Sequence, residues 1–399
     1  MSEFNMRLPD SVSFIIDRMR SCGFSAHVVG GSVRDSLIGR PLGDFDITTD
    51  ATPDQTKAVF SDYKTVDTGI KHGTVTLVID GVPYEITTYR VDGDYKDNRH
   101  PDSVTFTSCL EEDLARRDFT VNAMAYSPSS GLCDPFGGRA DADRRLIRAV
   151  GDPSVRFDED ALRILRALRF AAVLGFEIED NTKNAARELS ARLNSISKER
   201  IYTELKKLIS GVNAYSVISE FSDILSVCFE GLVIEKLPDK ERFESAGYLT
   251  RLASVIYLNS DNPAERAEGV LNALKTDKFT RTHTISVLNA YVDVSFDTER
   301  DTLAALAKYG KEAAEGALAL GTLLGRFNER ECNTLTAAIA SGKPYMISHL
   351  AIRGGDLAAL GIKGEAIGDA LSLLLAAVID GKAENSKDTL IEYFQKNNR

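Results

Sequence analysis

Asp44 and Asp46 are the residues whose chemistry is easiest to infer from type and spacing. They flank Phe45 at the start of the run Phe45–Thr49, which is typical of a β-strand, and strand residues two apart point to the same face. Two adjacent carboxylates repel each other unless a cation lies between them. Mg²⁺ is commonly held by one or two carboxylates together with substrate phosphates. The pair is therefore predicted to be catalytic and to bind Mg²⁺, although an isolated pair of this spacing more often lies in an exposed loop.

A glycine turn precedes this acidic pair. The apolar run Ala26–Val29 ends at Gly30–Gly31, and a helix carrying Arg34 is predicted over Ser32–Ile38. Glycine allows the backbone to approach a phosphate closely, and the first turn of a helix offers unpaired N–H groups to it. Gly31 and Arg34 are predicted to bind phosphate on this basis. A tight strand-to-helix turn would also explain two glycines.

A second polar cluster interrupts an otherwise apolar stretch at residues 111–126. It contains Arg116, Arg117 and Asp118, followed by Asn122. Arginine suits a polyphosphate, and Asp or Asn suits the hydroxyl groups of a ribose. The alternative is a set of exposed salt bridges, which are common and contribute little to stability.

A third pattern places Asp160, Arg163, Arg166 and Arg169 at intervals of three residues, so they are predicted to share one stripe of a helix over Asp158–Leu174. An Asp acceptor beside an Arg donor matches the hydrogen-bonding edges of both cytosine and adenine. Uracil and guanine would place a carbonyl oxygen against the carboxylate, and each unmet group costs about 1–3 kcal/mol. The alternative is an ordinary row of ion pairs on an amphipathic helix.

In this order the motifs resemble the signature of the DNA polymerase beta nucleotidyltransferase superfamily. They are closest to its branch of class II CCA-adding tRNA nucleotidyltransferases and bacterial poly(A) polymerases. The resemblance covers about residues 26–170 and extends weakly to 197–209. It implies that Asp44 and Asp46 are catalytic metal ligands, and that Glu85 is a candidate third carboxylate. It implies nucleotide contacts from Gly31, Arg34, Arg117, Asp160, Arg163, Arg166 and Arg169.

The elements needed to position these residues change in type along the chain. Up to about residue 150, short β-type runs alternate with helical pieces, and Thr74–Ile79 and Tyr84–Thr88 flank a hairpin signal at Asp80–Pro83. Beyond Gly151 the pattern is helical. We therefore expect an α+β nucleotidyltransferase head with a small mixed sheet over 1–150, followed by an all-α neck (151–212), body (213–290) and tRNA-binding tail (291–399).

Composition narrows the class of protein. The net charge of −11 argues against a nonspecific nucleic-acid binder, although the segment 183–207 is locally basic and could be either an RNA-binding face or a solvated helix face. The five cysteines show no CxxC spacing, which argues against a zinc finger. There is no apolar run long enough to span a membrane and no signal-peptide pattern, so a cytoplasmic protein is expected.

The product of the predicted reaction is open to several interpretations. Complete CCA addition from CTP and ATP is favoured, because Tyr89–Phe106 resembles an intact flexible loop and the sequence ends at Arg399 without a long basic extension. A poly(A) polymerase and the A-adding half of a split system are the alternatives. An inactive tRNA-binding protein would be expected to lose Asp44 or Asp46. A monomer or a homodimer is expected.

Overall fold

A computed structural model describes residues 4–93 and 104–397 of the chain. It divides into two compact units, which we call unit 1 (Met1–Cys228) and unit 2 (Phe229–Arg399), and each is described by itself. The finer division into head, neck, body and tail remains a prediction. Within the described residues, no helix combines the length and the apolar character needed to cross a bilayer.

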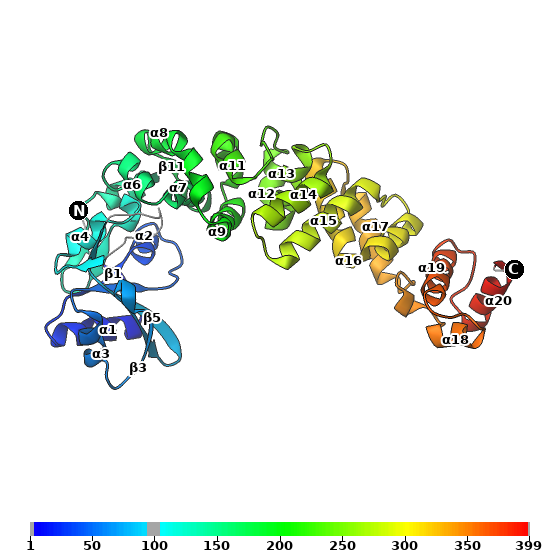
Figure 1. Cartoon of the computed structure of the whole chain (residues 1–399), viewed down its shortest axis with the longest axis horizontal. Coiled ribbons are helices and arrows are strands. Elements are labelled where there is room, and N and C mark those ends of the chain that lie inside the picture. Colours follow the sequence, from blue (N-terminus) through cyan, green and yellow to red (C-terminus); the bar gives the residue numbers. More distant parts are fainter. Residues whose placement is uncertain (1–3, 94–103, 398–399) are drawn as a thin grey trace. The chain divides into compact units, whose positions relative to one another are not determined.

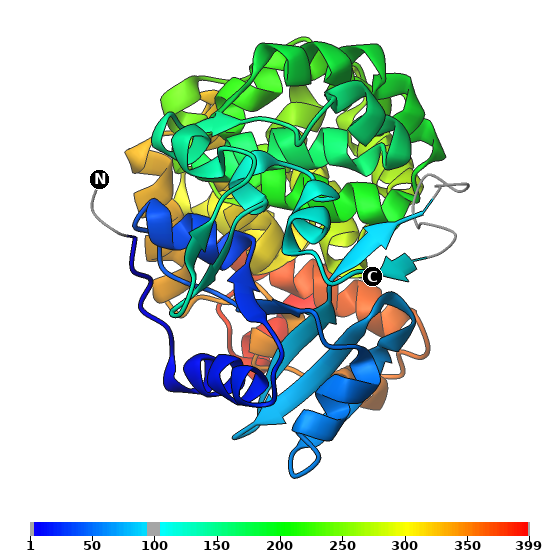
Figure 2. The ribbon, with the colours of Figure 1, turned by 90° about the vertical axis from the view of Figure 1, so that its left-hand side faces the viewer.

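Unit 1 contains a seven-stranded sheet in the order β3-β4-β5-β2-β1-β8-β9 (Figures 1 and 2). The strands are β1 (Ala26–Val29), β2 (Asp46–Thr49), β3 (Lys64–Gly69), β4 (Thr74–Ile79), β5 (Val82–Thr88), β8 (Ala125–Ser127) and β9 (Gly131–Cys133). β2 and β5 pair in parallel and the other neighbours pair antiparallel, so the sheet is mixed. The predicted α+β head is therefore confirmed.

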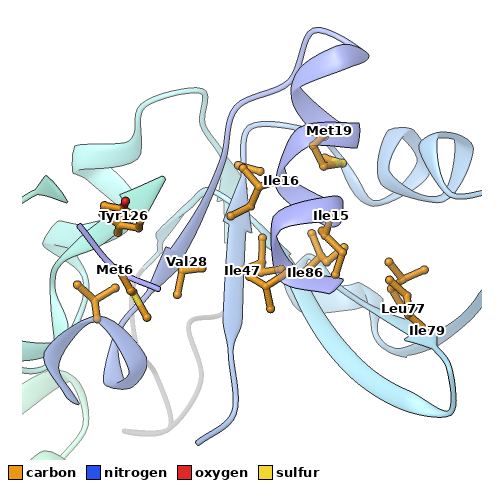
Figure 3. Close-up of a cluster of buried hydrophobic side chains, with 14 of the residues drawn as sticks. Met6, Ile15, Ile16, Met19, Val28, Ile47, Leu77, Ile79, Ile86 and Tyr126 are labelled. Atoms are coloured by element: carbon orange, nitrogen blue, oxygen red, sulfur yellow. The ribbon is translucent and has the colours of Figure 1, made fainter. Parts of the chain in front are cut away.

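One face of the sheet forms a hydrophobic core with α1 (Asp10–Ser21) and α3 (Pro53–Val59). Ile15 and Met19 from α1 meet Ile47 of β2 and Ile86 of β5 in this core (Figure 3). Burying each such side chain contributes about 1.5–3 kcal/mol. Since successive strand residues point to opposite faces, the neighbours of Ile47 and Ile86 in sequence are directed to the other face of the sheet.

The hairpin between β4 and β5 is tighter than the predicted four-residue link. Ile79 pairs directly with Val82, so the turn contains only Asp80 and Gly81. Both have positive φ angles, 51° and 81°, which is the conformation that Asp-Gly favours in a two-residue hairpin.

The remaining elements of unit 1 are mainly helices that follow or cover the sheet. The helices are α2 (Gly31–Leu37), α4 (Leu110–Ala115), α5 (Gly138–Asp143), α6 (Pro153–Glu159), α7 (Leu162–Leu174), α8 (Asp180–Glu188), α9 (Lys198–Ile209), α10 (Ala214–Glu220) and α11 (Ser222–Cys228), with 3₁₀ turns η2 (Thr120–Asn122) and η3 (Ser190–Ser195). Two short strand pairs join β6 (Arg90–Asp92) to β7 (Val104–Phe106) and β10 (Leu146–Ile147) to β11 (Glu177–Ile178). Helices α7 and α9 pack against each other.

The single helix predicted over Asp158–Leu174 is wrong at Asp160. That residue is extended, with φ −143° and ψ 103°, and separates α6 from α7. Its side-chain Oδ1 accepts the backbone N–H of Leu162 at 3.0 Å. A short acidic side chain that bonds to nearby backbone in this way competes with helix continuation. Asp160 therefore lies before the stripe formed by Arg163, Arg166 and Arg169, not within it.

Unit 2 is helical throughout its described residues (Figure 1). Its helices are α12 (Lys240–Ser245), α13 (Tyr248–Leu258), α14 (Pro263–Ala273), α15 (Lys278–Asp293), α16 (Glu299–Leu324), α17 (Glu329–Ala340), α18 (Gly354–Ala359), α19 (Ala366–Ile379) and α20 (Lys387–Asn397), with the 3₁₀ turn η4 (Ile347–His349). α15 packs against α13, α14 and α16. α16 bends at Gly310, whose φ of 79° interrupts the helix. The prediction of a helical remainder is confirmed, apart from β11 in unit 1.

Candidate active site

The glycine turn joins α2 to β1, which is the neighbour of the central strand β2. Gly30 has a φ of 78°, a conformation that glycine adopts without strain. A Cβ atom at this position would lie 3.4 Å from Nη1 of Arg117, so the turn also permits close approach of that side chain. The predicted role of Gly31 remains a prediction, but the turn does bring Arg34 and Arg117 to one place.

The two predicted metal ligands lie beside this turn. Asp46 is the first residue of β2 and pairs with Val29, the last residue of β1. Asp44 and Asp46 are both exposed, and with Glu85 they line one cavity of about 480 Å³, which we call the acidic cavity. The parallel register Ile47↔Ile86 continues backward to Asp46 and Glu85, which places these two carboxylates on the same face of the sheet.

Electrostatics at Asp46 fit the binding of a cation. Although Asp46 is exposed as a residue, nearby protein atoms partly desolvate its carboxyl and raise its pKa; the charge of Arg117 opposes this, and the charge of Asp44 raises the pKa further. Within the described residues, no three His, Cys, Asp or Glu side chains are grouped closely enough to hold a metal by themselves. A donor set of two carboxylates suits Mg²⁺, which usually keeps several waters and shares substrate phosphates.

A second cavity of about 420 Å³ also has Asp46 in its lining, and we call it the arginine-lined cavity. It is lined by Gly30, Gly31, Arg34, Asp46, Arg116, Arg117, Asp118, Asn122, Asp160, Leu162, Arg163, Arg166, Phe170 and Arg200. Six of these side chains are guanidinium groups and three are carboxylates, so the cavity carries an excess of positive charge. Clustered guanidinium groups are suited to a polyphosphate.

A chain of polar contacts connects the glycine turn to α7 through η2. Nη1 of Arg34 donates to Oδ1 of Asn122 at 2.5 Å, and Nδ2 of Asn122 donates to Oδ1 of Asp118 at 3.0 Å. The other oxygen of Asp118 accepts Nε of Arg166 at 2.8 Å. The two arginines are thereby held over the ring of Phe170, with Cζ atoms 5.2 Å and 5.5 Å from its centroid. Sequence reasoning had not identified Asp118 and Asn122 as the link.

Asp118 is the buried charge on which this chain depends. Burial opposes its ionisation, but the charge of Arg166, hydrogen bonds from Asn122 and Arg166, and the charge of Arg163 together lower its pKa to about 2. A carboxyl whose pKa is lower in the folded than in the unfolded chain stabilises the fold at pH values above its unfolded pKa of about 4. This stabilisation is lost as the pH falls toward 2.

We expect Asp118→Asn to reduce the free energy of unfolding of unit 1 by about 2–3 kcal/mol at pH 7. The difference between the variant and the wild type should shrink between pH 5 and pH 2, since the wild-type carboxylate becomes protonated there. Denaturant unfolding at several pH values measures both. Asp158→Asn serves as the control, because Asp158 forms an exposed ion pair with Arg192. An equal pH dependence in wild type and Asp118→Asn would contradict the prediction.

Arg117 lies just beyond the C-terminal end of α4 and lines the cavity. Asp113 is fully buried and lies 2.7 Å from Arg116 and 3.3 Å from Arg117. Burial lowers the pKa of Arg117, and the charge of Asp113 opposes this shift. Nε of Arg117 is buried without a hydrogen-bond partner, which leaves a donor in the wall of the arginine-lined cavity.

Asp160 and Arg163 both line the cavity, but each is held by a different partner, and their predicted contact with a base remains a prediction. Oδ2 of Asp160 accepts from Nη2 of Arg200 at 2.8 Å. Arg163 donates through Nη1 to Glu159 at 2.7 Å and through Nη2 to the carbonyl of Arg116 at 3.1 Å. A carboxylate accepts about four hydrogen bonds and a guanidinium donates five, so both retain capacity for a base. Arg200 is a site residue that sequence reasoning missed, although the motif at 197–209 contains it.

Arg166 and Arg169 occupy different positions although they are one helical turn apart. Arg166 lines the cavity. Arg169 is not among the described residues that line it, and instead pairs with Glu204 of α9 at 2.6 Å, with its Cζ 3.8 Å from the Phe170 ring centroid. The geometry gives Arg169 a supporting position behind Phe170, and its predicted contact with a nucleotide remains a prediction.

The basic segment 183–207 is largely neutralised within unit 1. Four of its cations, Lys183, Arg187, Arg192 and Arg200, form ion pairs with Glu220, Asp223, Asp158 and Asp160. These pairings favour the interpretation of a solvated helix face over a free basic surface.

The predicted flexible loop Tyr89–Phe106 is described only at its two ends. β6 and β7 pair antiparallel, with Arg90 opposite Phe106. Residues 94–103, which carry most of that prediction, lie outside the described residues.

Comparison with known proteins agrees with this geometry. The family model of the poly(A) polymerase head domain matches residues 26–148, and that of the probable RNA- and SrmB-binding site of polymerase A matches residues 175–223. The CCA-adding enzyme of Limosilactobacillus fermentum is 37% identical over 95% of this chain and 94% of its own length. That of Geobacillus thermodenitrificans is 36% identical, with 96% of each chain covered.

A solved structure indicates the same family. The CCA-adding enzyme of Bacillus stearothermophilus, crystallised in complex with CTP, superposes with a TM-score of 0.78 at 32% identity, covering 99% of this chain and 98% of that one. The chain therefore belongs to the family of CCA-adding enzymes and carries that family's poly(A) polymerase-type head domain.

Proposed function

We propose that this protein adds C, C and A to the 3′ end of tRNA from CTP and ATP, without a nucleic-acid template. One observation carries the proposal: a single arginine-lined cavity has Asp46 on its wall and also contains Asp160 and Arg163. Groups suited to phosphoryl chemistry and to reading a base edge therefore share one space. The CTP complex of the 32% identical relative supports CTP as a substrate.

The proposed reaction is an in-line displacement at phosphorus. The 3′-oxygen of the RNA forms a bond to the α-phosphorus, the bond from that phosphorus to the bridging oxygen breaks, and pyrophosphate leaves. Arg34 and Arg117 bind the triphosphate, where their charges oppose the negative charge that builds up. Asp44 and Asp46 would hold Mg²⁺, with Glu85 as the candidate third carboxylate. When bound, the ion lowers the pKa of the attacking hydroxyl and stabilises the leaving oxygen.

Base selection is proposed to rest on fixed side chains in place of a template strand. Arg200 and the Leu162 N–H orient the carboxylate of Asp160, and Glu159 and the Arg116 carbonyl orient Arg163. An amino group on the base, present in cytosine and adenine, can donate to Asp160. A carbonyl oxygen, present in uracil and guanine, would face that carboxylate with no proton between them.

The decisive experiment incubates the full-length protein with tRNA lacking its 3′ CCA, and in parallel with tRNA ending in C-C, in the presence of Mg²⁺ and CTP, ATP or both. Sequencing the 3′ ends is expected to show C-C from CTP alone and C-C-A from both nucleotides. Long A tails would assign the protein to poly(A) polymerases, and A addition only to a preformed C-C end would assign it to split systems. No incorporation would overturn all three assignments and leave an inactive RNA-binding protein. We also propose that the protein acts in the cytoplasm, because its proposed substrate is tRNA.

A further inference from the structure

Helix α15 of unit 2 exposes an aromatic stack at its N-terminal end. Phe279 is 58% exposed, the greatest exposure of any aromatic side chain among the exposed large hydrophobic residues in the described part of the chain. Its ring stacks on that of His283, one turn later, with centroids 5.4 Å apart and planes inclined by 23°. The opposite face of α15 packs against neighbouring helices through residues such as Leu288 and Tyr291. Phe279 therefore does not serve the core of unit 2.

The same part of α15 is positively charged in an acidic protein. Lys278 is exposed and Arg281 is partly exposed, and residues 278–292 contain no Asp or Glu. The first acid of the helix is Asp293, and it is already paired with Lys308 and hydrogen-bonded to Tyr309. Asp277, the N-cap residue before Lys278, is the nearest acid in sequence, and its carboxylate accepts hydrogen bonds from the backbone N–H and the hydroxyl of Thr280. This end of α15 therefore carries two cations against one acid, in a chain whose net charge is −11.

Packing holds the stack in place. A Cβ atom at Gly316 of α16 would lie 3.4 Å from Nε2 of His283, so the imidazole rests close to the α16 backbone. His283 in turn lies against one face of Phe279. A ring supported in this way loses little conformational freedom when a second ring stacks on it.

We propose that Lys278, Phe279, Arg281 and His283, which we call the α15 platform, bind RNA. An unpaired or splayed base stacks on Phe279, and the two cations contact neighbouring phosphates. RNA-binding proteins commonly combine aromatic stacking with basic side chains in this way. The inference rests on the proposed function, because it takes the substrate tRNA as the ligand. It adds a contact in unit 2, outside the catalytic site.

The test compares variants of the full-length protein for their affinity to tRNA lacking its CCA end. Phe279→Leu keeps an exposed apolar side chain but removes the aromatic ring, and is expected to weaken binding about tenfold. Phe279→Tyr should retain near wild-type affinity. Val292→Ala is the matched control, because Val292 is 64% exposed on the same helix, away from the stack. Lys278→Gln with Arg281→Gln should reduce the slope of log Kd against log salt by about 0.7 per lost phosphate contact.

Two readouts separate this inference from the proposed function. In steady-state incorporation assays, Phe279→Leu is expected to raise the KM for tRNA about tenfold, whereas Val292→Ala should leave both kcat and the KM for tRNA at wild-type values. Wild-type tRNA affinity in Phe279→Leu would overturn the α15 platform while leaving CCA addition intact. The α15 platform would also be overturned if the protein self-associated and this association were weakened by Phe279→Tyr but not by Val292→Ala. A second copy of the chain would then be the partner that covers Phe279. Loss of incorporation in the wild type would contradict the proposed function instead.

Discussion

Asp46→Asn is expected to reduce nucleotide incorporation on the order of a thousandfold without loss of the fold. The substitution removes the charge that Asp46 would supply to Mg²⁺ at the point where the two cavities meet. The stability of the folded protein, in contrast, should not fall in this variant and should rise slightly. A carboxyl whose pKa is raised in the folded protein binds its proton more tightly there than in the unfolded chain, so its ionised form opposes folding at pH 7.

Activity and thermal stability therefore need to be measured on the same samples. In the absence of divalent ions, Asp46→Asn should melt at or slightly above the wild-type temperature, because desolvation and repulsion from Asp44 outweigh the attraction of Arg117. Added Mg²⁺ should raise the melting temperature of the wild type and much less that of the variant. Asp54→Asn is the control, since Asp54 is an exposed acid of α3. Full activity in Asp46→Asn would contradict its assignment as catalytic.

The second large effect is expected in base selection. Asp160→Ala should admit UTP and GTP, so that discrimination against UTP falls by a factor of about 5 to 150, which corresponds to 1–3 kcal/mol for one unmet acceptor. The physical reason is that the variant no longer presents an anionic acceptor to the base. Competition between CTP and UTP at equal concentration, read by sequencing the added nucleotides, measures the change. Undiminished selectivity in a folded variant would show that Asp160 does not read the base.

Two further variants test whether the change in base selection comes from the Asp160 carboxylate and its orientation. Asp158→Ala removes an acid two residues away that pairs with Arg192 outside the arginine-lined cavity, and selectivity should not change. Arg200→Met leaves the carboxylate of Asp160 in place but removes the contact that orients it. Part of the selectivity against UTP should be lost in this variant, while the KM for tRNA should remain at the wild-type value.

Much of unit 1 could be predicted from the sequence because its signals are local. Strand alternation around Ile47, the glycines at the end of β1 and the Asp-Gly hairpin depend on side chains a few residues apart, and the structure confirms each element. The helix over Asp158–Leu174 was the exception. Periodicity predicted it as continuous, but the Asp160 side chain bonds to the backbone and interrupts it.

By itself, the sequence determined the class of chemistry, since the acidic pair, the glycine turn and the spaced arginines are recognisable as ordered motifs. Only the tertiary structure decided which side chains act together. Asp160 meets Arg200 across 40 residues, Asp118 meets Arg166 across 48, and Arg34 meets Asn122 across 88. Spacing along a chain reports which residues share a face of one element. Contacts between residues so far apart in the sequence form only when strands and helices pack. That packing gathers six arginines around one cavity beside Asp46.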